Sequence, residues 1–283
     1  MTFASPLGAT TVDIATHYDI GNRFYALWLD PSWVYSCAMW EPGDDLTRAQ
    51  QRKLTHHIEQ ARAPGKKRVL DIGCGWGALL QQLVHRHGVQ RALGLTLSDA
   101  QADHVRALRD PRIDVRTESW EAHVPEEPYD AIISIGALEH FVRPEMTDAQ
   151  RVARYAEFFR VCRSWLAPGA RMSLQTIAYG NMPGGKLASF ITDEVFPGSD
   201  LPRLHQLAAA FDGPFRVVLL RNDPVDYART CTEWCDRMLA HRTAAESMVG
   251  PQKVLVYERY LRMSAAGFNK GALNLYRVTL EAT

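Results

Sequence analysis

The sequence predicts an α/β fold in which a mostly parallel sheet carries helices on both faces. Between residues 68 and 177, short apolar runs alternate with amphipathic helical stretches, and this alternation is typical of βαβ units. The first apolar run leads directly into a glycine-rich turn, and the ligands of such sheets bind where the strands end in loops. The chain has 283 residues, 46% of them hydrophobic, so we expect a single domain with one sizeable core.

The elements are expected in two blocks up to residue 177. Residues 1–62 form an aromatic-rich helical segment, in which a helix over Thr47–Ala61 ends before Pro64 and Gly65, as helices commonly do. Residues 63–177 form the alternating core. Its predicted order is strand Arg68–Ile72, helix Ala78–His87, strand Ala92–Thr96, helix Ala100–Leu108, strand Ile113–Val115, strand Tyr129–Ile135, helix Arg151–Leu166 and strand Arg171–Ile177.

The last two blocks cap and complete the sheet. Residues 178–214 are interpreted as an insertion, because 178–202 are rich in glycine and proline and lack a regular period. Residues 215–283 follow with strand Phe215–Leu220, helices Val225–Arg242 and Gln252–Ala266, and strand Ala272–Leu280. We expect these final strands to join the sheet, which would then be mixed rather than purely parallel.

Charge and cysteine content limit the binding partners and the cellular compartment that we expect for this protein. Lysine plus arginine and aspartate plus glutamate both count 32, so net charge favours neither nucleic acid nor a strongly anionic membrane, although peripheral membrane contact through an apolar mouth stays open. No signal peptide or spanning segment is recognisable. The five cysteines are scattered without metal-site spacing, so free thiols in the cytoplasm and no metal site are expected. The oligomeric state cannot be read from the sequence.

The sharpest local feature is the stretch from Val69 to Gly77, with glycines at 73, 75 and 77. Glycines let the backbone adopt unusual φ values and approach a ligand closely. A phosphate-binding loop would continue with Lys and Ser or Thr, and a dinucleotide site would need an acid at the tip of the second strand. That strand ends in Thr96-Leu97-Ser98, so neither interpretation fits. A tight β–α turn without a ligand remains the alternative.

Several separate motifs accompany this loop in a fixed order. They are His17-Tyr18-Asp19-Ile20, Phe24-Tyr25, Leu29-Asp30-Pro31, Tyr35-Ser36-Cys37-Ala38, Gly94 to Gln101, Trp120-Glu121, Ser134 to Phe141, Phe196-Pro197-Gly198, Tyr227 to Thr230 and Tyr257 to Tyr260. With them the chain resembles the cyclopropane fatty acid synthases, a family of S-adenosylmethionine-dependent methyltransferases, and its length matches the mycolic acid cyclopropane synthases. The resemblance runs from about His17 to the C-terminus and implies the Rossmann-like class I methyltransferase fold.

The resemblance implies a binding site for S-adenosylmethionine. Gly73, Gly75 and Gly77 would run under its amino acid part, while Thr96 and Gln101 would hold the ribose region. The other residues that we assign to the cofactor are Trp120 and Glu121 beside the adenine, Tyr35 and Ser36 over the sulfonium end, and Asp71 and Ile135 at the ends of two strands. Trp120 could equally be plain core, and Glu121 could serve a helix N-terminus.

The resemblance also implies the catalytic residues. In the family, the glutamate that matches Glu139 helps to bind a bicarbonate ion that removes a proton. Cys37 and Tyr227 match two more residues of that site. The family's histidine is replaced by Gln175, which can form hydrogen bonds but cannot carry a proton, so bicarbonate use is in question. His140 is the nearest titratable alternative, although a structural role suits it as well.

Other departures from the family also fall on the acceptor side. The stretch between Ile177 and Phe196 is shorter than in the mycolic acid enzymes, and Ser264 stands where the family often has cysteine. We therefore expect an acceptor pocket of different shape, whose substrate need not be a long lipid. Cys37 is not expected to act as a nucleophile, because the sequence places no His or Lys to lower its pKa.

We predict methylation of an electron-rich carbon in an apolar acceptor, with formation of a carbocation and loss of a proton. The acceptor could be an unsaturated acyl chain, which would become a cyclopropane, or a small specialised metabolite such as a terpenoid or an indole. Methylation of an amine nitrogen is a related alternative. A noncatalytic protein that binds S-adenosylmethionine or lipid would be expected to lack the intact glycine loop or Glu139, and both are present.

Overall fold

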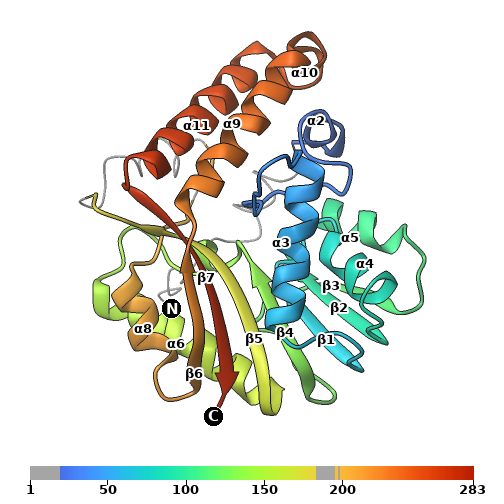
Figure 1. The fold of residues 1–283 in the computed structure, drawn as a ribbon, viewed down its shortest axis with the longest axis vertical. Coiled ribbons are helices and arrows are strands. Elements are labelled where there is room, and N and C mark those ends of the chain that lie inside the picture. The colour runs from blue at the N-terminus through green and yellow to red at the C-terminus, as the bar shows by residue number, and fades with distance from the viewer. Residues whose placement is uncertain (1–19, 183–194, 197) are drawn as a thin grey trace, which may run out of the picture.

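A computed structural model describes residues 20–182, 195–196 and 198–283. Its centre is a seven-stranded sheet, and a group of helices lies above one end of it (Figure 1). In chain order the elements are α2 (Asn22–Ala26), α3 (Leu46–Gln60), β1 (Arg68–Ile72), α4 (Ala78–His85), β2 (Arg91–Thr96), α5 (Asp99–Arg106), β3 (Ile113–Thr117), β4 (Tyr129–Ile135), the 3₁₀ helix η1 (Leu138–His140), α6 (Asp148–Trp165), β5 (Leu166–Tyr179), α8 (Leu204–Phe211), β6 (Phe215–Asn222), α9 (Pro224–Ala240), α10 (Arg242–Val249), α11 (Pro251–Asn269) and β7 (Leu273–Ala282).

The strands lie in the order β3-β2-β1-β4-β5-β7-β6. The pairs from β3 to β5 are parallel, and β7 is antiparallel to both of its neighbours. The sheet is therefore mixed, as the sequence predicted. The register places Ile135 of β4 beside Gln175 of β5, and Gln175 beside Arg277 of β7. Three side chains that are distant in sequence are thus neighbours across the strands at the site.

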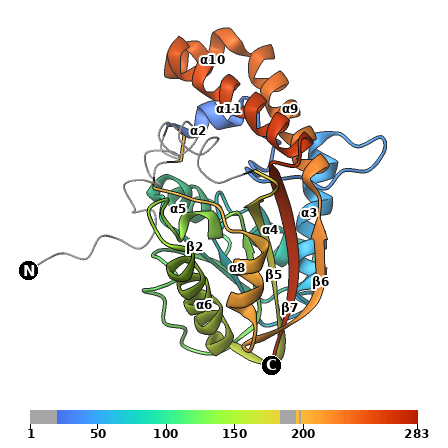
Figure 2. The same cartoon turned by 90° about the vertical axis from the view of Figure 1, so that its left-hand side faces the viewer.

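Helices cover both faces of the sheet (Figure 2). On one face α3, α4 and α5 pack against the strands through an aliphatic cluster that includes Leu54, Leu83 and Val105. On the other face α6 and α8 bury an aromatic cluster around Phe158 and Phe159. Burial on both faces explains why strands such as β1 and β4 are nearly continuous apolar runs.

A separate helical cap is formed by α9, α10 and α11, with α2 beside it (Figures 1 and 2). Its core is aromatic: Trp28 packs edge-on against Trp234, and Phe24 against Tyr257. These contacts join the start of the chain to its end, so the cap is built from segments more than 200 residues apart. Among the described residues, no helix is both long and apolar enough to cross a bilayer.

Every strand of the predicted core is found, and the differences lie mainly at the ends of elements. The helix predicted over Arg151–Leu166 begins earlier, at Asp148, because Thr147 and Gln150 form a capping box. The strand predicted over Arg171–Ile177 extends over Leu166–Tyr179. Helix α8 lies in the block interpreted as an insertion, and α10 is a separate helix just after the predicted Val225–Arg242 helix, which ends at Ala240 as α9. The motif residues 17–19 and 197, and residues 183–194 of the predicted insertion, fall outside the described part.

Candidate active site

The glycine loop joins β1 to α4 at the carboxyl end of the sheet. Backbone N–H groups of Gly73 and Cys74 donate to the carbonyl of Leu95 on β2, at 2.9 and 3.0 Å. All three loop glycines have positive φ, between 53° and 82°, where a side chain is strained. A Cβ on Gly73 would lie 2.7 Å from that of Ala137, and one on Gly77 would lie 2.8 Å from a methyl of Val105. Close packing therefore requires these two glycines.

Gly75 differs from Gly73 and Gly77, because no atom of the described residues lies within 4 Å of the place its Cβ would take. Gly136, which follows β4 and lines the pocket described below, has a φ of 72° and the same open space. Two glycines with free space beside them, on adjacent strand ends, leave a cradle that side chains would fill. This is the local geometry that a ligand needs to lie against the backbone.

Polar groups at the next strand end are already organised. Thr96 and Gln101 are both buried, and the Thr96 hydroxyl donates to the Gln101 Oε1 at 2.7 Å. Ser98 caps α5 by accepting from the Gln101 backbone N–H. These groups offer neutral hydrogen-bonding partners beside the cradle, and their assignment to the ribose region stays a prediction.

Trp120 and Glu121 already have protein partners. The Trp120 ring packs against Phe141 and Phe158, and the Arg154 guanidinium lies 4.6 Å from its centre. Glu121 forms an ion pair with Arg154 at 2.8 Å. Their assignment to the adenine remains a prediction.

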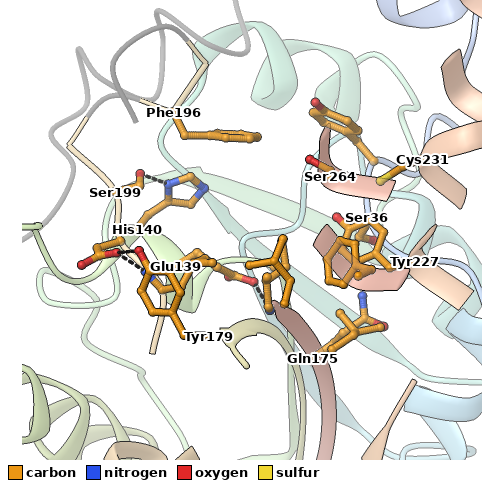
Figure 3. Close-up of a pocket in the computed structure, with 18 of the residues that line it drawn as sticks. Ser36, Glu139, His140, Gln175, Tyr179, Phe196, Ser199, Tyr227, Cys231 and Ser264 are labelled. Carbon is orange, nitrogen blue, oxygen red and sulfur yellow. Dashed lines mark hydrogen bonds between the residues drawn. The ribbon is translucent and has the colours of Figure 1, made fainter. Parts of the chain in front are cut away.

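Beside the cradle lies a pocket of about 1000 Å³, which includes its open mouth. Its wall comes from the strand ends, the loop after β4, the segment before α8, and helices α9 and α11 (Figure 3). Most of the lining is apolar or aromatic, formed by Tyr35, Ile177, Tyr179, Phe196, Leu201, Tyr227, Tyr260, Phe268, Leu273 and Leu275. Such a lining suits an apolar ligand oriented by a few polar groups.

Glu139 is the most informative polar group in this pocket. It lies on η1, is only 7% exposed, and accepts a hydrogen bond at Oε1 from the Ile177 N–H at 2.6 Å. Its other oxygen, Oε2, is buried without a hydrogen-bond partner among the described residues. Burial raises the pKa of this carboxyl to about 7, although the Ile177 bond acts in the opposite direction. A carboxyl with this pKa can exchange a proton near neutral pH.

The segment before α8 is tied to the pocket by Asp200. Its carboxylate forms an ion pair with Arg151 of α6 and accepts from the Tyr179 hydroxyl at 2.6 Å, and its N–H donates to the Glu139 carbonyl at 3.1 Å. His140 lines the same wall, where its Nδ1 lies 2.7 Å from the Ser199 hydroxyl, and burial lowers its pKa to about 4. His140 is therefore neutral near pH 7 and is poorly suited to hold a proton.

The remaining predicted catalytic residues lie at different depths. Tyr227 lines the pocket and stacks on Phe268, with ring centres 4.6 Å apart. Gln175 lies at the pocket floor. Cys37 is fully buried and is not among the lining residues, and its thiol donates to the Ala38 carbonyl at 3.1 Å. Burial raises the pKa of Cys37 to about 12, so a nucleophilic thiolate is not available.

Beneath the pocket lies a set of buried basic residues that the sequence analysis did not identify. Lys53 of α3 donates to the Ser36 hydroxyl at 2.8 Å, and burial together with nearby Arg277 lowers the Lys53 pKa to about 7. His57, one helical turn further, lies 2.8 Å from the Ser173 hydroxyl. Polar residues at helical spacing on the inner face of α3, and an arginine inside the apolar strand β7, were the available signals.

The predicted cofactor residues Asp71, Ser36 and Ile135 lie at the same edge. Asp71 is buried on β1, where burial raises its pKa to about 7 although Lys53 acts in the opposite direction. Ser36 lines the pocket and is fixed by Lys53, while Ile135 ends β4 directly before Gly136. The structure thus brings the glycine loop, these strand ends and Glu139 to one edge of the sheet.

Comparison with known proteins agrees with this arrangement. The family model for mycolic acid cyclopropane synthetase matches residues 8–278. Cyclopropane mycolic acid synthase 3 of Mycobacterium tuberculosis is 32% identical over 293 residues, covering 95% of this chain and 96% of the relative. Cyclopropane mycolic acid synthase 2 of Mycobacterium leprae is 33% identical over 272 residues, covering 88% and 86%.

Solved structures give the same result. The cyclopropane synthase MmaA2 of Mycobacterium tuberculosis superposes with a TM-score of 0.88 at 30% identity, covering 97% of this chain and 99% of the other. Mycolic acid cyclopropane synthase CmaA1, complexed with S-adenosylhomocysteine (SAH) and the detergent CTAB, has the same score, identity and coverage. Coclaurine N-methyltransferase, at 19% identity and a TM-score of 0.79, shares the fold. The chain therefore belongs to the mycolic acid cyclopropane synthetase family and is an S-adenosylmethionine-dependent methyltransferase of the cyclopropane synthase type.

Proposed function

We propose that the enzyme methylates a carbon of an electron-rich double bond in an apolar acceptor, and that Glu139 manages the proton that is then lost. The observation that carries this proposal is a buried carboxyl group in a mostly apolar pocket, with one oxygen that has no hydrogen-bond partner among the described residues. Leaving such an oxygen without a partner costs stability. A functional role accounts for that cost, since buried groups with shifted pKa values gather at active sites.

The residues present fit S-adenosylmethionine. The open spaces beside Gly75 and Gly136 would receive the cofactor, and Thr96 and Gln101 would hold its ribose region. When bound, S-adenosylmethionine supplies an activated methyl group on a sulfonium. The protein's own contribution is to orient the acceptor and to exclude water, as the apolar pocket would do.

The aromatic lining supports chemistry that passes through a positive charge. Methyl transfer to an alkene leaves a carbocation, which aromatic faces stabilise without reacting with it. Tyr227, Phe196 and Phe268 line the pocket. Two thiols could compete as nucleophiles: Cys231 lines the pocket, and Cys37 is buried outside the lining. Burial raises the pKa of both thiols, so neither supplies a thiolate near neutral pH. The pocket thus offers the cation stabilising faces and little nucleophilic competition.

Proton removal completes the reaction. A C–H bond breaks, and its electron pair either closes a three-membered ring with the new methyl carbon or forms a new double bond. The proton passes to the free Oε2 of Glu139, directly or through a bicarbonate ion as the family resemblance implies. Ile177 holds Oε1 at 2.6 Å, so the carboxyl group keeps a fixed orientation while Oε2 takes the proton.

The acceptor class within this proposal has two members. An unsaturated acyl chain would match the names of the relatives, and one solved neighbour is complexed with the detergent CTAB. A small specialised metabolite, such as a terpenoid or an indole, would also suit a mostly apolar lining with a few polar groups. Amine N-methylation is the second candidate function, because aromatic rings and the Glu139 carboxylate would also bind an ammonium group.

The test is turnover with S-adenosylmethionine labelled with ¹³C in its methyl group. Oleoyl phospholipid vesicles, geraniol, indole and benzylamine would be offered separately, and NMR of the product would distinguish a cyclopropane, a methylated alkene and a methylated amine. Glu139→Gln should bind the cofactor normally but turn over on the order of 10²-fold more slowly, because a general base is lost. Repeating the assay with and without bicarbonate at fixed pH would reveal whether that ion participates.

Glu145→Gln is the matched control, since Glu145 is exposed and lies six residues further along the same segment. This variant should keep full turnover. Full activity in Glu139→Gln would remove the proposed role of Glu139. If ¹³C-labelled N-methylbenzylamine were the sole product, amine methylation would replace C-methylation as the proposed reaction.

A further inference from the structure

Gln175 places a polar side chain at the floor of the acceptor pocket, where it would contact a bound acceptor. It lies on β5 at the floor of the pocket, and its side chain is only 1% exposed. Its neighbours across the sheet are Ile135 on one side and Arg277 on the other. A buried amide in this place must either be satisfied by the protein or be reserved for a ligand.

Arg277 determines which end of the amide faces the pocket. Its Nε donates to the Oε1 of Gln175 at 3.0 Å, and His57 Nε2 lies 3.5 Å from the same oxygen. A guanidinium has only donors, so the amide end that faces it must be the oxygen. The amide nitrogen, Nε2, is left on the pocket side (Figure 3). No described residue accepts a hydrogen bond from that nitrogen.

Further contacts fix the orientation of the Arg277 guanidinium. One of its terminal nitrogens donates to the Ala38 carbonyl at 2.8 Å, and the other forms an ion pair with Asp223. The guanidinium is 1% exposed, and Gln175, Ala38, Asp223 and Cys37 all accept hydrogen bonds from it. Its positive charge is matched by Asp223 and, at 3.8 Å, by Asp226. Gln175 is thus a donor of fixed direction rather than a mobile side chain.

The charges around the pocket indicate what this donor receives. Its lining includes the carboxyl groups of Glu139 and Asp200, and among the described lining residues there is no lysine or arginine. Asp200 is paired with Arg151, and His140 is neutral. Lys53 and Arg277 lie behind the lining residues Ser36 and Gln175, and the charge of Arg277 is already matched by Asp223. An anion would therefore meet no cation in the lining itself and would lie beside a carboxyl group, which is unfavourable. A neutral oxygen carries no such cost.

We infer that the Gln175 amide, fixed by Arg277, donates a hydrogen bond to a neutral oxygen of the acceptor, so that the acceptor is an apolar molecule carrying a carbonyl or hydroxyl group. This inference rests on the proposed function for its acceptor, and it makes Gln175 a specificity-determining residue and Arg277 a positioning residue. It excludes a pure hydrocarbon segment as the preferred occupant of the pocket floor.

The test measures binding, and three ligands of equal length serve as probes: 2-decanone, 2-decanol and 1-decene. Calorimetry would give their affinities for the wild-type enzyme and for Gln175→Leu. The ratio of ketone to alkene affinity should fall about tenfold in Gln175→Leu, the scale of one hydrogen bond to a buried donor. Because both ligands are measured in the same variant, a change of pocket shape that weakens both equally leaves this ratio unchanged.

A second variant distinguishes donation from mere polarity. Gln175→Glu replaces the amide nitrogen by an oxygen, which can accept from an alcohol but cannot donate to a ketone. This variant should lose the ketone preference about as much as Gln175→Leu, while 2-decanol keeps its affinity within about threefold. Arg277→Lys keeps the positive charge but not the hydrogen-bond geometry of the guanidinium. This variant should lower the ratio of 2-decanone to 1-decene affinity and leave the affinity for 1-decene unchanged.

Two results would overturn the inference. One is an unchanged ketone-to-alkene ratio in both Gln175 variants, with folding verified by thermal unfolding. The other is competition, in which millimolar bicarbonate at constant pH weakens ketone binding to the wild-type enzyme and thereby assigns the amide to an anion. Because the assay requires no turnover, failure of the methylation experiment would leave this result standing, and the reverse also holds.

Discussion

The proposed cofactor side and the proposed acceptor side of this enzyme are built in different ways. The cradle that we assign to the cofactor comes from one contiguous stretch, Gly73 to Gly77, and from short turns after β2 and β4, so it is formed mainly by the backbone. The acceptor pocket is assembled from six or more segments. Its polar contacts join residues far apart in sequence, such as Arg277 with Gln175 and with Ala38.

This difference has a chemical reason. The cofactor is a fixed molecule, and a turn of the right shape can serve it regardless of the rest of the chain. The acceptor must be matched in shape, polarity and proton transfer together, and these depend on side chains that only the tertiary structure brings into contact. Changes on the two sides should therefore separate cleanly in binding experiments, which the following predictions exploit.

The largest expected effect is on the cofactor side. Gly75→Val should weaken S-adenosylmethionine binding by about 100-fold or more, since the new side chain would fill the open space and also strain a φ of 53°. Calorimetry on the folded variant is the measurement. Acceptor affinity, determined separately with the 2-decanone probe, should change far less.

Gly88→Val is the matched control for strain. Gly88 is exposed in the turn before β2, has a φ of 68°, and also has open space where a Cβ would lie. Both variants bear a similar backbone cost, about 1–2 kcal/mol, but only Gly75 lies beside the cradle. Equal loss of cofactor affinity in the two variants would show that strain, and not ligand contact, explains the effect.

The same contrast explains how much could be predicted from the sequence. The core strands, in their succession along the chain, and the glycine loop could be predicted from local periodicity and from motif residues such as Gly73 and Gly75. Glu139 could be located from its motif and because it follows strand β4 after a short Gly-Ala turn. Arg277 could not be placed at the site, because its role depends on β7 inserting antiparallel beside β5, and nothing local encodes that pairing.

Cys37 shows the opposite difficulty. Its motif suggested a place in the site, and no basic residue near it in sequence could lower its pKa. The structure does bring Arg277 and Lys53 close, and both act to lower the pKa, yet desolvation outweighs them. A motif thus does not indicate how deeply each of its residues is buried.

The second prediction tests the acceptor side through pH. If Glu139 accepts the proton, kcat should fall by about tenfold per pH unit below pH 7, because burial has raised the Glu139 pKa to about 7 and only the carboxylate is active. The measurement is kcat from pH 5 to pH 9 at saturating substrates. Glu139→Gln should lose this acidic limb, whereas a limb that persists in the variant would assign the titration to another group.

Ionisation of Glu139 should also change folding stability, but in the opposite direction: a rise in pH through 7 increases kcat and lowers stability. Because the folded pKa is raised from 4.5 to about 7, the protonated carboxyl stabilises the fold below pH 4.5, and this contribution is lost as pH rises through 7. Glu139→Gln should therefore have a higher Tm than wild type at pH 8 and not at pH 4. A destabilised variant at pH 8 would mean that the carboxylate has a structural role.

A moderate effect is expected at the segment before α8. Asp200→Asn would break the buried ion pair with Arg151 but could keep the bond from Tyr179. We expect the acceptor KM to rise roughly tenfold, because removing one partner leaves an uncompensated charge that displaces the pocket wall. Cofactor affinity should stay within about twofold of wild type.

Asp212→Asn provides the comparison for this variant, since Asp212 is exposed at the end of α8 and lies outside the pocket lining. It should leave both constants unchanged. If Asp200→Asn weakened the cofactor and the acceptor equally, the two sides would not be separable in the way that the structure suggests.

The smallest effect is expected at Cys37, despite its place in a motif beside the site. Cys37→Ala should leave kcat within about threefold of wild type, because a thiol with a pKa of about 12 contributes no thiolate near pH 7. Steady-state turnover is the measurement, and iodoacetamide should fail to inactivate the native wild-type enzyme. Loss of a buried sulfur should instead lower the free energy of unfolding by about 1 kcal/mol. A 100-fold loss of kcat with an unchanged Tm would reverse this assignment, since Arg277, 3.5 Å from the sulfur, would then be stabilising a reactive thiolate.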